Sequence, residues 1–154
     1  MPNIIHIETS TSVCSAALSS DGVVQCHFGN FEGPSHASLL GVYVKQIMDF
    51  SRDKGVKVDA VAVSSGPGSY TGLRIGVSEA KGLCFGLKVP LISVPTLELL
   101  ACTTMFVEGI VPLATDMLAL AERAFRNGQF EDVAYFEPFY LKEFIATTPK
   151  NKIS

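Results

Sequence analysis

The stretch SSGPGSYTGLRIG, residues 64–76, places four glycines between a run of small apolar residues and a helix-like run. The preceding AVAVSS, residues 60–65, has the small and β-branched composition of a buried strand. Apolar residues then recur at helical spacing from about residue 71 to residue 87. A helix N-terminus behind a glycine turn can hold an anion with its backbone N–H groups. The same glycines can instead let the chain pass close to a neighbouring segment, and the residues alone leave both interpretations open.

The stretch does not match the common phosphate-binding or nucleophile motifs. A P-loop needs a second glycine five positions after the first, but Gly66 is followed there by Thr71. The dinucleotide fingerprint G-x-G-x-x-G fails at the same residue, after Gly66 and Gly68. A G-x-S-x-G nucleophile elbow is also missing from the sequence.

The segments around the stretch predict three strands first and alternating helices and strands afterwards. Asp21 and Gly22 form a strong hairpin signal between two apolar runs. An antiparallel three-strand unit that is extended by helical crossovers gives a mixed sheet. The order therefore predicts an α/β fold with a mixed five-stranded sheet flanked by helices, the ribonuclease-H-like core of actin, sugar kinases and the heat-shock ATPases (the ASKHA group). The expected strands are residues 3–8, 13–19, 23–29, 60–65 and 89–94, and the expected helices are residues 36–52, 71–87, a helix beginning at 95–96, and residues 115–126.

Composition excludes several classes of protein. Of the 154 residues, 47% are hydrophobic and 18% are charged, which excludes an intrinsically disordered chain. A net charge of -3 argues against this chain gripping a nucleic-acid backbone by itself. No apolar run approaches the roughly 20 residues of a membrane span. The start MPNIIHIETS lacks the pattern of a signal peptide, so we expect a strand there and no membrane association.

The cysteines give no sign of a metal site or a disulfide framework. Cys14, Cys26, Cys84 and Cys102 are widely separated, and no pair forms C-x-x-C. Because the chain also has only three histidines, a zinc site is not expected. Reduced, buried thiols are typical of a cytoplasmic protein, which is the location we expect.

Four segments together carry a resemblance to a known family. They are IETSTSVCSAAL (residues 7–18), HASLL (36–40), the long run from 59 to 101 that contains the glycine stretch, and EPFYLK (137–142). These segments resemble the TsaB (YeaZ) family, a bacterial partner in making threonylcarbamoyladenosine in tRNA. The match is strong over residues 1–102 and weaker over residues 136–142.

The resemblance implies a scaffold and not an enzyme. Members of this family are related to TsaD, the subunit that performs the transfer and binds a metal and a nucleotide, and they are regarded as non-catalytic. The resemblance implies a chain that pairs with a TsaD-like subunit, forms a homodimer when alone, and meets tRNA only through the complex. A TsaE-like ATPase is a further candidate partner. No cofactor is expected on this chain alone, and ATP or ADP at the interface of the complex is left open.

The sequence departs from its metal-binding and nucleotide-binding relatives at two positions. Those relatives hold a metal with H-x-x-x-H, whereas here His36 is followed four residues later by Leu40. His36 is therefore expected as a polar group at a helix start, with no metal and no catalytic residue in the chain. Glu8 stands where actin-like ATPases carry an aspartate near the Mg²⁺-nucleotide, and the hydroxyls after it either line a phosphate or bond their own turn. The candidate residues near an anion or nucleotide are Glu8, Thr9, Ser10, Thr11, Gly66, Gly68, Ser69 and Gly72.

The two long predicted helices form the candidate partner surface. Residues 39–50 are apolar over most of the helix circumference and not along one stripe. Gly72, Gly76 and Ala80 follow at a spacing of four, which lets either this chain's own sheet or a helix of a second subunit approach closely. A small chain has few elements to cover both helices, so we expect a partner on at least one face. The expected interface residues are His36, Leu39, Leu40, Tyr43, Ile47, Arg74, Gly76, Val77 and Ala80.

We expect two units, an N-terminal actin-like lobe over residues 1–106 and a remnant of a second lobe over residues 107–154. TsaB-like proteins carry a larger second lobe, which would lie between the positions of Gly109 and Ile110 and is truncated or partly absent here. Two other functions remain as alternatives, an ATPase of the actin and sugar-kinase type and a metallopeptidase of the related glycoprotease family. The short second lobe counts against the ATPase, and Leu40 counts against the peptidase.

Overall fold

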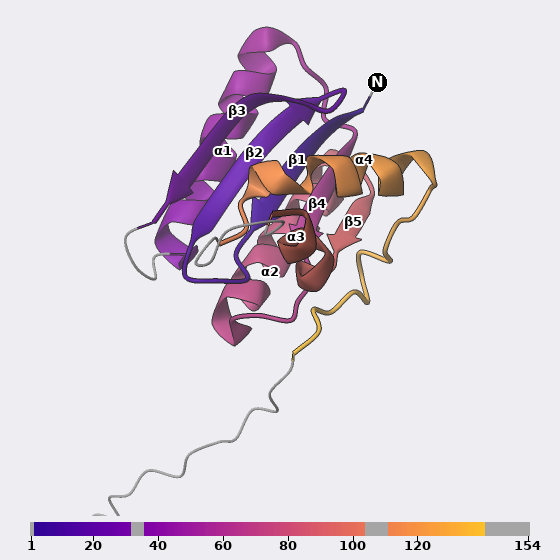
Figure 1. Cartoon of the computed structure of the whole chain (residues 1–154). Coiled ribbons are helices and arrows are strands. Elements are labelled where there is room, and N and C mark those ends of the chain that lie inside the picture. The colour runs from indigo at the N-terminus through magenta and orange to yellow at the C-terminus, as the bar shows by residue number, and fades with distance from the viewer. Residues whose placement is uncertain (1, 32–35, 104–110, 141–154) are drawn as a thin grey trace, which may run out of the picture.

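The structure is a computed structural model that describes residues 2–31, 36–103 and 111–140 (Figure 1). Most predicted elements are present with ends shifted by one or two residues, and the last predicted helix begins as a 3-10 turn. In chain order the elements are β1 (Asn3–Glu8), β2 (Cys14–Ser20), β3 (Val23–Asn30), α1 (His36–Lys54), β4 (Ala60–Ser64), α2 (Tyr70–Leu87), β5 (Leu91–Val94), α3 (Thr96–Thr103), the 3-10 turn η1 (Ala114–Met117) and α4 (Leu118–Arg126).

The predicted mixed five-stranded sheet is confirmed. Its strand order is β3-β2-β1-β4-β5. β2 is antiparallel to both β1 and β3, and β4 is parallel to both β1 and β5. The β2–β3 hairpin turns at Asp21 and Gly22, whose φ angles are 49° and 73°. Positive φ at both turn residues gives the backbone twist that favours a tight hairpin, and aspartate and glycine tolerate it well.

Helices cover both faces of the sheet (Figure 1). Alternate residues of β1 point to opposite faces, so Ile5 and Ile7 join the core beneath α1 and α2. Ile4 faces the other way and packs with Met117 and Ala121 beneath η1 and α4. Residues 114–126, part of the predicted remnant of a second lobe, contribute directly to the core on this second face.

The chain returns along the edge of the sheet after α4. The backbone N–H of Glu131 donates to the carbonyl of Leu91 at 2.9 Å, and this bridge closes the outer edge of β5. Further along, the N–H of Phe139 donates to the carbonyl of Ser65 at 2.7 Å. The described part of the segment after α4 therefore reaches the glycine stretch at Phe139 (Figure 1).

Part of the predicted partner surface is buried within this chain. Both helices pack one face tightly on this chain's own sheet, because the apolar residues of the two helices fill the core beneath them. A residue with no exposed side chain cannot contact another subunit through it. The predicted interface residues that are buried within this chain are Leu40, Ile47, Gly76, Val77 and Ala80.

Candidate functional site

The turn after β1 packs directly against the glycine stretch. The hydroxyl of Thr9 donates to the carbonyl of Gly72 at 2.7 Å. The N–H of Ser69 donates to the carbonyl of Ser10 at 2.7 Å. The residues predicted to lie near an anion are thus brought together in one place, although Thr11 bonds its own turn by accepting from the N–H of Val13 at 3.2 Å.

The glycines of the stretch are positions of close approach. A Cβ on Gly66 would collide with the carbonyl oxygen of Phe139, and one on Gly68 would lie 2.8 Å from the Cβ of Ser10. A Cβ on Gly72 would meet the carbonyl oxygen of Thr9. Because backbone atoms stand in these places, the second interpretation of the stretch, contact with a neighbouring segment, describes the structure.

Three backbone donors around the glycine stretch are used within the chain. The N–H of Ser10 donates to the carboxylate of Glu8 at 2.6 Å. At the start of α2, Ser69 caps the helix by accepting from the N–H of Gly72 at 3.2 Å. The N–H of Ser69 itself is engaged by the carbonyl of Ser10, so a phosphate that used these three donors would have to displace internal hydrogen bonds.

Glu8 lies in a closed environment. Its side chain is fully buried, and one carboxylate oxygen accepts from both the N–H and the hydroxyl of Ser10. Burial raises the pKa of this carboxyl from 4.5 to about 7, and the negative charge of Asp116 acts in the same direction. The neighbouring Ser15, paired with Glu8 across the strands, accepts from the N–H of Ala114 in η1 at 2.9 Å. η1 therefore lies beside the end of β1 at Glu8.

The described histidines and carboxylates do not form a metal centre. Within residues 2–31, 36–103 and 111–140, no three His, Cys, Asp or Glu side chains are grouped to hold a metal ion. His6 is fully buried with its Nε2 2.8 Å from the hydroxyl of Ser19, and burial lowers its pKa to about 3. His36 is the first residue of α1, and its side chain lies outside the described part of the chain.

An exposed aromatic and cationic cluster lies beside this closed core. The rings of Tyr70 and Tyr140 are 4.6 Å apart between centroids. The guanidinium of Arg74 lies 5.5 Å from the Tyr70 ring centroid and 3.4 Å from its hydroxyl. An open groove of about 550 Å³ runs between α1 and α2 past this cluster, lined by Ala37, Tyr70, Thr71, Arg74, Ile75, Ser78 and Glu79.

Among the predicted interface residues whose side chains the structure describes, Leu39, Tyr43 and Arg74 are not buried. Arg74 is exposed, and Leu39 and Tyr43 are half-buried on α1. The Tyr43 ring stacks on Phe28 of β3 with centroids 6.0 Å apart. A mixed surface of aromatic rings and an arginine is typical of protein contacts.

Comparison with known proteins now identifies the family. The family model described as "TsaD: tRNA N6-adenosine threonylcarbamoyltransferase" matches residues 32–139. The chain belongs to the TsaD family. Within the TsaD family, the resemblance to TsaB that the four segments indicated is confirmed by the relatives that follow.

Relatives of this TsaD-family chain are named "tRNA threonylcarbamoyladenosine biosynthesis protein TsaB". The Escherichia coli K12 protein is 39% identical over 98 residues, which are 64% of this chain and 42% of the relative. The Bacillus subtilis protein is 30% identical over 146 residues, which are 92% of this chain and 64% of the relative. The chain thus spans between two fifths and two thirds of the length of these curated relatives.

A solved structure gives the same fold for this TsaD-family chain. YeaZ from Pseudomonas aeruginosa superposes with a TM-score of 0.78 at 22% identity, over 92% of this chain and the whole of that chain. The TsaB-like architecture predicted from the sequence is therefore confirmed, as a ribonuclease-H-like α/β fold. No helix in the described ranges is long and apolar enough to cross a membrane.

Sequence reasoning missed the anchors of the returning segment in this TsaD-family chain. The ammonium of Lys81 donates to the carbonyl oxygens of Phe136 at 3.0 Å and Ala134 at 3.3 Å. The EPFYLK segment was noticed as a family feature, but nothing in its residues indicated that Phe139 would bond the glycine stretch.

Proposed function

We propose that this chain is a non-catalytic subunit of the machinery that makes threonylcarbamoyladenosine in tRNA. It supports a TsaD-like subunit that transfers the threonylcarbamoyl group to adenosine. Membership of the TsaD family and the TsaB names of its relatives support this role. The observation that carries it is the closed glycine stretch, whose donors at Ser10, Ser69 and Gly72 serve the fold and not a substrate.

The same geometry gives no support to the ATPase alternative. A nucleotide-hydrolysing site needs a positioned metal and donors aimed at the phosphates. Here Glu8 is buried and η1 covers the end of β1. Metallopeptidase chemistry needs a second ligand beside His36, and Leu40 is buried in the core instead.

The groove between α1 and α2 is the surface that we assign to the partner. It lies next to the Tyr70–Arg74 cluster, where aromatic rings and a guanidinium offer strong contacts for little loss of side-chain entropy. In the isolated protein the same faces pair two copies about a two-fold axis. In the cell the TsaD-like subunit replaces the second copy. tRNA and a TsaE-like ATPase then bind the assembled pair. ATP or ADP binds at the interface of that pair and does not bind to this chain alone.

The location that we propose for the protein is the cytoplasm. Its role is tested by reconstitution. The full chain is mixed with the TsaD-like subunit of the same organism, and complex formation is followed by light scattering while tRNA modification is measured by mass spectrometry. Complex formation and tRNA modification are both expected to require this chain. The chain alone is expected to hydrolyse no ATP in a single-turnover assay. Metal-dependent ATP turnover by the isolated chain, abolished by Glu8→Ala, would overturn the proposal in favour of the actin-like ATPase.

A further inference from the structure

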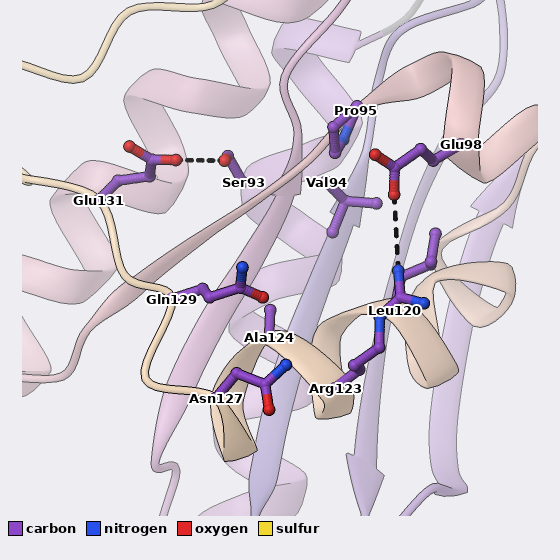
Figure 2. Close-up of a pocket in the computed structure, with 10 residues that line it drawn as sticks. All are labelled: Ser93, Val94, Pro95, Glu98, Leu120, Arg123, Ala124, Asn127, Gln129 and Glu131. Atoms are coloured by element: carbon purple, nitrogen blue, oxygen red, sulfur yellow. Dashed lines mark hydrogen bonds and ion pairs between the residues drawn. The ribbon is translucent and has the colours of Figure 1, made fainter.

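The two outer edges of the sheet differ in how this chain covers them. At β5, the N–H of Glu131 donates to the carbonyl of Leu91, and the carboxylate of Glu131 accepts from the hydroxyl of Ser93 (Figure 2). The opposite edge is β3, the last strand in the order of the sheet. Within the described part of the chain, β3 pairs with β2 and has no strand on its outer side. We call this outer side the β3 edge.

The β3 edge lacks most of the features that keep strand edges from pairing with other strands. Natural edges are commonly short, or they carry lysine or proline. β3 is eight residues long, and the run VVQCHFGNF, residues 23–31, contains no Asp, Glu, Lys, Arg or Pro. A bulge falls at Gln25, where the register with β2 shifts, but residues 26–30 keep a regular register. The outer backbone groups of such a run are complementary to another extended strand.

Exposed apolar side chains lie at both ends of the β3 edge. Val24 is 36% exposed near its start, and Phe31 is 64% exposed just beyond its end. Both lie on the face of the sheet that carries η1. Val24 is opposite Ser19, whose hydroxyl contacts His6 on that side of β1. Phe31 lines a hollow on the same face together with Ala114 of η1.

A second copy in antiparallel orientation brings these two ends together. A two-fold axis perpendicular to the sheet sets one residue opposite itself and keeps the faces of the two sheets on the same side. With the axis at Phe28, the middle of residues 26–30, Phe31 of one copy lies opposite the bulge at Gln25 of the other, beside Val24. The symmetry repeats this contact at the other end. Because the run holds no Asp, Glu, Lys or Arg, the two copies meet no like charges.

We propose that the β3 edge pairs with the β3 edge of a second copy of this chain and joins the two sheets into one. Phe31 of each copy packs on Val24 of the other, on the face that carries η1. On the opposite face, Phe28 is already stacked on Tyr43 of its own chain. The β3 edge shares no residue with the groove between α1 and α2, so this inference does not depend on the partner role proposed there.

The experiment is sedimentation velocity of the full chain, of Val24→Lys, of Phe31→Glu, and of an equimolar mixture of these two variants. Each variant alone is expected to associate about tenfold more weakly than the parent, because its substitution disrupts two symmetry-related contacts. The mixture is expected to associate about fivefold more tightly than either variant alone. It regains one contact of Phe31 with Val24 and gains one ion pair between the two new side chains. Any pairing through α1 and α2 is common to all samples and cancels in this comparison.

Two controls isolate the contact between residues 24 and 31. Phe31→Lys mixed with Val24→Lys is expected to associate more weakly than the mixture with Phe31→Glu, because like charges then meet. Leu97→Lys adds a charge at a side chain that is 64% exposed on α3, and it is expected to associate like the parent. Far-UV spectra of all variants are expected to match, because the altered side chains are at the surface. A mixture of Val24→Lys and Phe31→Glu that gains nothing over its components would overturn the proposal. So would a parent that associates no better than the single variants, or an equal loss in Leu97→Lys.

Discussion

The hydroxyl of Thr9 occupies the space that a side chain on Gly76 would need. The same hydroxyl donates to the carbonyl of Gly72 one turn earlier in α2. Gly72 and Gly76 thus allow α2 to pack directly against the turn that follows β1. The spacing of four residues, which also fitted a contact between subunits, serves packing within this chain.

Gly76→Ala is expected to destabilise the fold by about 1–3 kcal/mol, because the new methyl group overpacks against Thr9. The free energy of unfolding is measured by urea titration. Gly82→Ala is the matched control, since Gly82 lies in the same helix with no atom within 4 Å of an added Cβ. It is expected to stabilise by about 0.5–1 kcal/mol through helix propensity. If both variants lost the same stability, the packing role of Gly76 would be wrong.

Glu8 is expected to make the protein less stable as the pH rises from about 4.5 to about 7. The folded pKa, about 7, is above the ordinary value of 4.5, so the folded state binds more protons than the unfolded state in this window. Stability is therefore highest below the window and falls through it, by on the order of 3 kcal/mol from this group. Glu8→Gln keeps an acceptor for Ser10 and removes this loss.

The measurement is unfolding free energy against pH for the parent and for Glu8→Gln. Burial lowers the pKa of His6, so its contribution is lost as the pH falls below 6.5 towards 3. That dependence has the opposite sign and is common to both proteins, so it cancels in their difference. A difference that stays constant from pH 4 to pH 8 would contradict the assignment to Glu8.

Lys81→Met is expected to loosen the segment after α4 without unfolding the sheet. The substitution removes the donor to the carbonyls of Phe136 and Ala134 and costs about 1 kcal/mol. Hydrogen exchange at the amide of Phe139 is expected to speed up, while exchange in β1 stays slow. Lys45→Met is the control, because its ammonium pairs only with the exposed Asp49 of its own helix among the contacts seen here. Equal exchange at Phe139 in both variants would refute the anchoring role.

Arg74→Ala is expected to weaken binding of the TsaD-like subunit by about tenfold, as an arginine at the centre of an interface commonly does. Modification of tRNA is expected to fall at low subunit concentration and to recover at saturating concentration, because assembly and not chemistry is affected. Arg52→Ala is the matched control on α1, where the guanidinium bonds only Asp49 among the described contacts. Failure to recover at saturation would place Arg74 in a chemical step.

The sheet was predictable because the amino-acid composition of its strands differs sharply from that of the segments that flank them. β4 is a uniform run of small apolar residues, and the Asp21–Gly22 turn matches the conformation that a hairpin demands. The antiparallel start and the helical crossovers then leave few ways to arrange five strands. Element ends moved by one or two residues, as hydrogen bonding at the ends of helices and strands is set by local packing.

The site was harder to predict because one pattern served two purposes. Gly76 and Ala80 at a spacing of four indicate a close approach, but the spacing does not say which segment approaches. An apolar residue such as Ile47 fits a position in this chain's core and a position in a contact with a second subunit equally well. The contact between Lys81 and Phe136 joins residues that are far apart in the sequence, so local sequence propensities do not predict it.

The bond between Phe139 and Ser65 sets an order of events during synthesis. The glycine stretch leaves the ribosome long before residue 139, and contacts between distant segments form late because closing the loop costs entropy. A nascent chain therefore carries an α2 whose first turn still lacks its neighbour. Only a chain that has been synthesised beyond residue 140 presents Tyr140 against Tyr70. A partner that contacts this pair of rings would therefore bind only chains that already contain residue 140.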